Sequence, residues 1–262
     1  MFDLSLGSRL NVALLDQLIP EGIESGTVFT VEFDPDSQWY AVAATIAVRY
    51  LQAGGRVAYV DVTRPPDVVK GELGRVGLDF EATVKEGRLR VDDWYTATLT
   101  GGRISAEQEK DVLEPIDGGT RLRSVKVADI SVEWLRLFKY GPRPFDVTET
   151  WPPGALTILD SASELMRFNE EGVYLEFVIT RAFPNERKAK RIRFGGIARG
   201  VHSESFYKRM EAASDGIIDL RVMERDDEAK NLIRVRSLKG QRHDARWHEI
   251  EIGKNGDAHL KN

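Results

Sequence analysis

The stretch TVFTVEFDPDSQWYAVAATIAVRYLQAGGRVAYVDV, residues 27–62, decides the fold. Residues 27–33 are rich in β-branched and aromatic side chains, which predicts a buried strand. Residues 38–52 place apolar side chains three and four positions apart, which predicts a helix that ends at the glycine pair 54–55. Residues 56–62 predict a second strand. A strand, a helix and a strand in this order make a βαβ unit, so the two strands are predicted to run parallel.

Alternating helices and strands are predicted on both sides of this unit. A short helix at 14–19 precedes it, and after it we expect a helix at 68–74, a strand at 89–92, a helix at 132–140, a strand at 154–160, a helix at 172–189, a strand at 191–199 and a helix at 203–213. The region at about 96–131 is largely polar, and we expect an insertion or a long loop there. Alternating segments at 216–224, 231–237 and 246–252 predict antiparallel strands. The sequence therefore predicts a single α/β domain over residues 1–262, with a mostly parallel central sheet flanked by helices and with C-terminal antiparallel strands.

The composition excludes several classes of protein. With 262 residues and 42% hydrophobic side chains, the chain fits neither a disordered nor a fibrous protein. The absence of Cys excludes a disulfide scaffold, thiolate zinc sites and a Cys nucleophile. The net charge of −5 does not indicate a nucleic-acid surface. Arg outnumbers Lys by 25 to 12 among the 37 basic residues, which is typical of thermophiles and also of GC-rich coding.

We expect neither a targeting signal nor a membrane span. Residues 1–8 contain Asp3 and lack a basic region before an apolar run, which is not the pattern of a signal peptide. The longest mostly apolar stretch, 41–51, contains Thr45 and Arg49 and is far shorter than the roughly 20 residues that cross a bilayer. The sequence therefore predicts a cytoplasmic protein.

Several short motifs occur in order along the chain. They are LDQL at 15–18, GIESG at 22–26, YVDVTRPP at 59–66, VGLDF at 76–80, LTILDS at 156–161, ASDGIIDL at 213–220 and KGQRH at 239–243. Their order and spacing resemble the KaiC-like branch of the RecA-type P-loop ATPases, over most of the chain outside residues 97–131. The resemblance implies a RecA-like fold, a phosphate loop after the first strand, two catalytic acids after the second strand, and a Walker B acid at Asp160.

The segment at the phosphate-loop position departs from the family pattern. It consists of Phe33, Asp34, Pro35, Asp36, Ser37, Gln38, Trp39 and Tyr40. A phosphate loop needs Gly for backbone access, Lys for the phosphate charge and Ser or Thr for Mg²⁺, but Phe33 and Gln38 replace Gly, Trp39 replaces Lys, and Tyr40 replaces the hydroxyl residue. Pro35 removes one N–H donor. Asp34 and Asp36 would add carboxylates beside the phosphates, and one such pair about 4 Å apart costs about 4 kcal/mol at an effective dielectric of ~20. We therefore expect no tight triphosphate complex.

The catalytic acids give a second departure. The resemblance places the two consecutive acids at Thr63 and Arg64, while Asp61 lies two residues earlier and cannot simply replace them. Asp160 is either a residual metal ligand or a polar residue at the end of a strand. Hydrolysis needs a positioned phosphate, a metal ion and a water together. We therefore predict a pseudo-ATPase with a degenerate Walker A motif, and we expect no enzymatic activity, no cofactor and no metal site.

Five residues form candidate binding surfaces. Trp39 and Tyr40 either fill the volume that a nucleotide would occupy or form a platform for a peptide or a base. Lys239, Arg242 and His243 resemble the segment that reaches a neighbouring subunit in the family's rings, and they are a candidate interface.

Two further features of the sequence each allow a functional and a structural interpretation. The basic run at 187–193 either contacts nucleic acid or is a solvated helix end. Ser161 and Ser163 follow a predicted strand, but they do not form a nucleophile elbow, and no His lies near them in sequence to activate them.

These observations favour a non-catalytic protein with a regulatory or scaffolding role, which binds a protein or peptide near the altered phosphate loop. The expected partner is an active paralogue or a second copy of the chain, not nucleic acid and not a membrane, and a monomer or dimer is as compatible with the sequence as a ring. The alternatives are an atypical nucleotide-binding ATPase that uses Asp61 and Asp160, and a DNA-recombination accessory protein that uses the basic run.

Overall fold

The computed structural model describes residues 9–12, 14–95, 109–116, 119–126, 153–167, 170–225 and 228–261. Its main sheet is built from β3 (Val28–Phe33), β4 (Val57–Asp61), β5 (Leu89–Asp93), β8 (Leu156–Leu159), β9 (Ile192–Ala198), β10 (Gly216–Arg225), β11 (Glu228–Leu238), β12 (His248–Ile252) and β13 (Ala258–Leu260). The nine strands lie in the order β13-β12-β11-β10-β3-β9-β8-β4-β5. The neighbours β10, β3, β9, β8, β4 and β5 pair in parallel with one another. The neighbours β10, β11, β12 and β13 pair antiparallel. The predicted mostly parallel α/β sheet with antiparallel C-terminal strands is confirmed.

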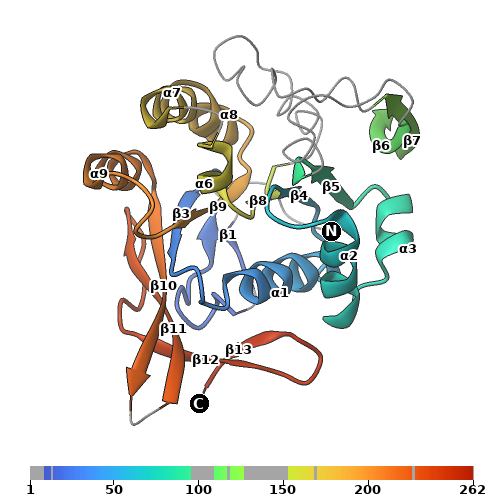
Figure 1. Ribbon diagram of the computed structural model, residues 1–262. Coiled ribbons are helices and arrows are strands. Elements are labelled where there is room, and N and C mark those ends of the chain that lie inside the picture. Colours follow the sequence, from blue (N-terminus) through green and yellow to red (C-terminus); the bar gives the residue numbers. More distant parts are fainter. Residues whose placement is uncertain are drawn as a thin grey trace.

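Helices cover both faces of the sheet, as Figure 1 shows. One face carries α1 (Trp39–Gln52), α2 (Pro66–Arg75) and α3 (Phe80–Lys85), and the other carries α6 (Ala162–Leu165), α7 (Glu171–Phe177), a π-helical turn η4 (Val178–Ala182), α8 (Phe183–Lys188) and α9 (Glu204–Ala213). Two hydrophobic cores follow from this arrangement, because successive side chains of a strand point to opposite faces. In β3, for example, Phe29 belongs to the α1 core and Val28 to the core beneath α6–α9.

The βαβ unit forms as predicted. Every residue of β3 and β4 is buried, and the ring of Phe29 stacks on that of Phe194 in β9 with 4.9 Å between centroids. Gly54, with φ of 88°, provides the left-handed residue that ends α1. The unit therefore places the segment 34–38 at the carboxyl end of β3, where α/β sheets hold ligands.

The helix predicted at 172–189 is continuous but changes its winding in the middle. Pro184 lacks an N–H and cannot donate to a carbonyl one turn earlier. The chain widens into η4 just before it, where the N–H of Phe183 bonds the carbonyl of Val178, five residues back. The proline therefore explains why the segment is divided into α7, η4 and α8.

The structure differs from the sequence predictions in its short elements. Residues 14–19 form turns instead of a helix, because Leu14 has a left-handed φ of 77° that breaks the helical path. The sequence missed α3, α6, β13 and the two-residue pair β1 (Arg9–Leu10) and β2 (Ile23–Glu24), which are too short for a periodic pattern. The helix predicted at 132–140 lies outside the described residues. Within the region 96–131, β6 (Glu109–Ile116) and β7 (Gly119–Lys126) pair antiparallel, and the rest of this region lies outside the described residues.

Within the ranges that the structure describes, none of the helices combines the length and the apolar character that crossing a bilayer requires.

Candidate functional site

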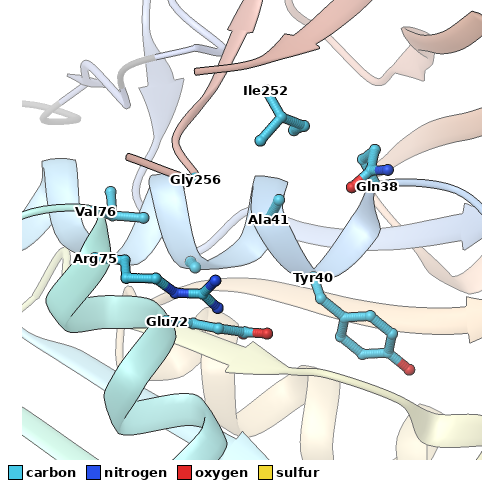
Figure 2. Close-up of a pocket in the computed structure, with 9 residues that line it drawn as sticks. Gln38, Tyr40, Ala41, Glu72, Arg75, Val76, Ile252 and Gly256 are labelled. Atoms are coloured by element: carbon cyan, nitrogen blue, oxygen red, sulfur yellow. The ribbon is translucent and has the colours of Figure 1, made fainter. Parts of the chain in front are cut away.

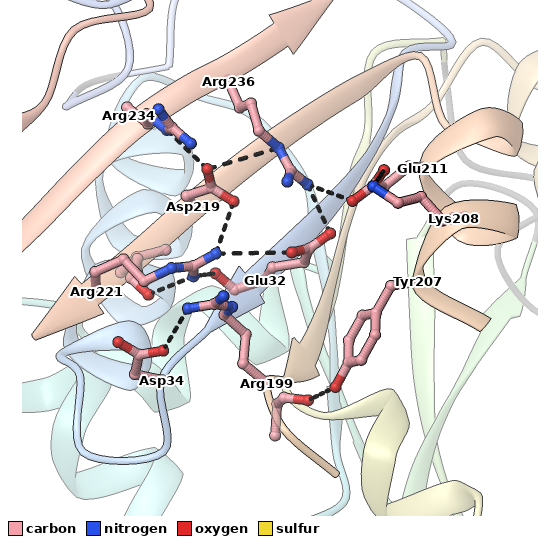
Figure 3. Close-up of polar contacts among 12 residues, drawn as sticks. Glu32, Asp34, Arg199, Tyr207, Lys208, Glu211, Asp219, Arg221, Arg234 and Arg236 are labelled. Carbon is pink, nitrogen blue, oxygen red and sulfur yellow. Dashed lines mark hydrogen bonds and ion pairs between the residues drawn. The ribbon is translucent and has the colours of Figure 1, made fainter. Parts of the chain in front are cut away.

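Asp34 fastens the altered phosphate-loop segment to two neighbouring strands. Its carboxylate accepts a hydrogen bond from the guanidinium of Arg199 at 3.2 Å (Figure 3). The carboxylate also accepts a hydrogen bond from the backbone N–H of Val222 at 3.1 Å, and the N–H of Asp34 donates to the carbonyl of Leu220 at 3.1 Å. The N–H of Ser37 donates back to the carbonyl of Asp34 at 2.9 Å. The carboxylate of Asp34 is therefore held by β10 and by the residue that follows β9.

Trp39, at the position where the resemblance places Lys, points into the protein. Its side chain is 1% exposed, its indole Nε1 donates to the main-chain carbonyl of Asp160 at 2.7 Å, and its ring stacks on Phe33 with 6.0 Å between centroids. Gly196 makes room for it, because a Cβ at this glycine would lie 2.6 Å from the indole nitrogen and 2.4 Å from the carbonyl oxygen of Asp160. The indole therefore fills the space between the carboxyl ends of β3, β8 and β9.

Arg64 stands beside Tyr40, at one of the positions of the replaced acids. Its guanidinium lies 4.2 Å from the centroid of the Tyr40 ring, donates to the hydroxyl of Tyr59 at 2.9 Å, and pairs with the carboxylate of Glu72. Burial raises the pKa of Tyr40, so its hydroxyl stays protonated. A fixed positive charge thus stands where the family pattern has a carboxylate.

The carboxylate of Asp160 is fully buried and is bound by the chain that follows β4. It accepts hydrogen bonds from the backbone N–H of Val62 at 3.0 Å, the hydroxyl of Thr63 at 2.6 Å and the N–H of Thr63 at 3.3 Å. The Nε atom of Arg64 lies 4.0 Å from the same carboxylate. None of these contacts could be predicted from the sequence, because β4 and β8 are neighbours only in the folded sheet.

Asp61 is the second buried carboxylate of this region. One of its oxygens accepts a hydrogen bond from the N–H of Arg64 at 3.2 Å, and the other has no hydrogen-bond partner. Burial, together with the charge of Asp160, raises the pKa of Asp61 to about 7. Burial raises the pKa of Asp160 as well. The two carboxylates therefore favour a state in which a proton is held between them.

A cavity of about 310 Å³ opens beside Tyr40 (Figure 2). Its lining comes from α1, α2 and the β12–β13 hairpin and consists of Gln38, Tyr40, Ala41, Ala44, Glu72, Arg75, Val76, Ile252 and Gly256. We call this cavity the α1–α2 groove. It offers an apolar floor with one carboxylate and one guanidinium, and Ile252 at its margin is 40% exposed. The sequence could not reveal it, because its three walls are separated by up to about two hundred residues.

Five charged residues on the opposite face form a network that the sequence predictions missed (Figure 3). The strand register sets Glu32 beside Asp219, and both are buried. Arg221 and Arg234 donate to Asp219 at 3.1 and 2.7 Å, and Arg236 donates to Glu32 at 2.7 Å. The arginines neutralise two adjacent buried acids, which is a structural task at the junction between β3 and the antiparallel strands. The only sequence signal is the presence of charged residues at strand positions that should be apolar.

The other residues singled out from the sequence lie elsewhere. Lys239 donates to the carbonyl of Ala212 at 2.8 Å, Arg242 is exposed, and the ring of His243 contacts the carbonyl of Gln241. These three residues follow β11.

The basic run is partly internal. Arg191 and Arg193 are buried, with Arg191 donating to the carboxylate of Glu186 at 2.7 Å. Arg187 pairs with Asp215 at 3.0 Å. Arg193 lies 3.7 Å from the carboxylate of Glu186, so three of the five basic side chains in the run contact carboxylates of the chain itself. Across the described part of the chain, no group of three or more His, Cys, Asp or Glu side chains is arranged to hold a metal ion.

Comparison with known proteins identifies the fold. No family model and no curated protein matches the chain. Among solved structures, the chain is similar to a KaiC-like protein from the hyperthermophilic archaeon Pyrococcus horikoshii, with a TM-score of 0.64 and 17% sequence identity, over 98% of this chain and 100% of that chain. The chain thus has a KaiC-like fold of the RecA type, as its motifs led us to expect. At this identity the likeness establishes the fold alone.

The packing around Trp39 predicts that alanine substitution of two adjacent glycines will affect stability differently. We expect Gly196→Ala to lower the free energy of unfolding by about 2–3 kcal/mol, because the new methyl group displaces the indole or the Asp160 carbonyl. Gly195→Ala is the matched control, since the nearest atoms to its Cβ lie at 3.8 and 3.9 Å, an ordinary contact distance. Urea denaturation measures the free energy of unfolding of both variants. Equal effects of the two variants would contradict the packing described for Trp39.

The raised pKa of Asp61 predicts a pH-dependent stability. The folded state binds the proton more tightly than the unfolded state, so this contribution to stability is complete below about pH 4 and is lost as pH rises to about 7. Asp61→Asn cannot ionise, and its amide can donate to Asp160. We expect it to be more stable than the wild type at about pH 8, with the difference shrinking toward about pH 5. Denaturant titrations at both pH values measure this, with the exposed Asp36→Asn as the control; a gain that is the same at both pH values would argue against a shared proton.

Proposed function

We propose that this chain has a RecA/KaiC-like fold that does not catalyse ATP hydrolysis, that its role is regulatory or scaffolding, and that it acts by binding a protein or peptide segment in the α1–α2 groove. The observation that carries the proposal is the buried indole of Trp39, which is hydrogen-bonded to Asp160 at the position where the family pattern has the phosphate-binding Lys. An indole cannot neutralise a phosphate, and this one is already enclosed by the protein.

The neighbouring residues support the same conclusion. Hydrolysis of ATP needs a metal ion, a positioned phosphate and an activated water. The Asp160 carboxylate already accepts three hydrogen bonds from Val62 and Thr63, and Arg64 points its charge at Tyr40 and Glu72. The Asp160 carboxylate and the Arg64 guanidinium are therefore used to hold the fold together.

The α1–α2 groove supports the binding part of the proposal. It lies directly beside the altered loop, because Gln38 and Tyr40 form part of its wall. Its apolar floor suits a side chain such as Leu or Ile, and Glu72 and Arg75 offer an acceptor and a donor for the partner's backbone. We propose a segment of an active paralogue or of a second copy of this chain as the ligand.

The first test is calorimetric titration of the full chain with ATP and Mg²⁺. We expect no binding with a Kd below about 1 mM and no release of phosphate, because the loop contains two acids and because a buried Trp stands in place of the phosphate-binding Lys. An active RecA-type ATPase titrated under the same conditions is the control. Micromolar binding together with turnover would contradict the proposal.

The second test addresses the groove. Ile252→Glu places a charge at the apolar margin of the groove. The wild type is used to capture partner proteins from the cells that naturally express it, and we expect the amount captured by this variant to be at least about tenfold lower. Met223→Glu is the matched control, because Met223 is 42% exposed on β10, outside the groove. Quantitative mass spectrometry of the captured proteins gives the result, and an identical set on both variants would argue against the groove.

A further inference from the structure

Three residues that are far apart in sequence form a hydrogen-bonded relay at the carboxyl edge of the sheet. Ser163 lies in α6 after β8, His202 lies in the loop after β9, and Glu171 begins α7. The Nε2 atom of His202 lies 2.9 Å from the Ser163 hydroxyl oxygen, and its Nδ1 atom lies 3.2 Å from a carboxylate oxygen of Glu171. No His lies near Ser163 in sequence, but the fold brings His202 beside it, because β8 and β9 are adjacent parallel strands whose ends meet.

The contacts around the relay determine where its protons lie. Glu171 accepts hydrogen bonds from the backbone N–H and the hydroxyl of Ser203, and these bonds lower the pKa of Glu171. An ionised carboxylate only accepts, so Nδ1 of His202 carries a hydrogen. Burial lowers the pKa of His202, which leaves the ring neutral and its Nε2 lone pair free to accept. The Ser163 hydroxyl therefore donates to Nε2.

The hydroxyl and the ring are held in place from other directions. The backbone N–H of Ala198 donates to the Ser163 oxygen at 2.9 Å, so the remaining hydrogen of that oxygen points to His202. The imidazole lies 4.6 Å from the ring of Phe206 and is 7% exposed. Ser163 itself is only half-buried, and Val201 beside His202 is 57% exposed. The hydroxyl is thus oriented by the protein, in a residue that is only partly buried.

We propose that Ser163 is a nucleophile toward small carboxylic esters, that His202 is its general base, and that Glu171 is the positioning residue that holds the imidazole. The tautomer, the order of the three groups and the two distances are those that Ser–His–carboxylate catalysis requires. This activity goes beyond the binding role proposed above and uses none of the residues of the α1–α2 groove.

The reaction balances with an ester and water as the only reactants. The oxygen of Ser163 forms a bond to the ester carbonyl carbon while its proton passes to Nε2 of His202. The carbon–alkoxide bond then breaks, and His202 returns the proton to the leaving alcohol, which leaves Ser163 acylated. Water, deprotonated by His202, attacks the acyl carbon and releases the acid and the free Ser163 hydroxyl.

The test uses the full chain and a fluorophosphonate, which bonds through phosphorus to an activated serine oxygen and releases fluoride. We expect one adduct by intact-protein mass spectrometry, located on Ser163 by peptide mapping, and turnover of p-nitrophenyl acetate that depends on Ser163. Ser163→Ala should abolish the adduct and that turnover, and Ser237→Ala, an exposed serine on β11, should leave both unchanged.

The His and Glu variants separate catalysis from structure. His202→Gln should slow labelling of Ser163 by about 100-fold while thermal unfolding shows a folded protein. Glu171→Gln removes the negative charge that stabilises the imidazolium formed when His202 takes the Ser163 proton, so labelling should slow, and Glu171→Asp, which keeps the charge, should retain part of the rate. A folded wild type that is not labelled at Ser163, or a His202→Gln variant labelled at the wild-type rate, would overturn the proposal and leave the relay as a set of structural hydrogen bonds.

Discussion

The enclosed indole of Trp39 constrains how the carboxyl ends of β3, β8 and β9 meet. Its hydrogen bond to the carbonyl of Asp160 joins α1 to the end of β8, and its ring covers Phe33 at the end of β3. Gly196 in β9 has no side chain because any Cβ would collide with the indole or with that carbonyl. A large aromatic side chain in this place adds buried apolar area where a phosphate loop would otherwise leave a solvated anion site.

Buried charge is the second constraint, and the chain satisfies it by local pairing. Burial of two carboxylates in one region is unfavourable unless they are hydrogen-bonded or share a proton. Asp160 receives the N–H and hydroxyl donors that follow β4, while burial and the charge of Asp160 raise the pKa of Asp61 to about 7, so that Asp61 is largely protonated below that pH. Arg64 then has Glu72 and Tyr59 as partners, which fixes its charge beside Tyr40. The region is therefore stabilised without any bound nucleotide.

The two proposed sites lie on opposite sides of the same sheet. The α1–α2 groove belongs to the face covered by α1 and α2, and the Ser163 relay belongs to the face covered by α6–α9. Both lie near the carboxyl ends of the parallel strands, where loops converge and side chains from distant segments meet. A binding role in the groove and nucleophilic chemistry at Ser163 use different side chains, so each can be lost by mutation without the other.

The sequence by itself determined the parallel core and the chemical identity of the altered loop. Residues 27–62 have periodic apolar patterns and clear glycine stops, and such local signals depend little on distant contacts. Short elements such as α6 and β13 escaped prediction because a few residues carry no period. Only the tertiary structure decided that Trp39 would be enclosed, that Asp160 would be bonded by Thr63, and that His202 would face Ser163. The physical reason is that these contacts join the ends of neighbouring strands, and the order of strands in the sheet, not the order along the chain, makes them neighbours.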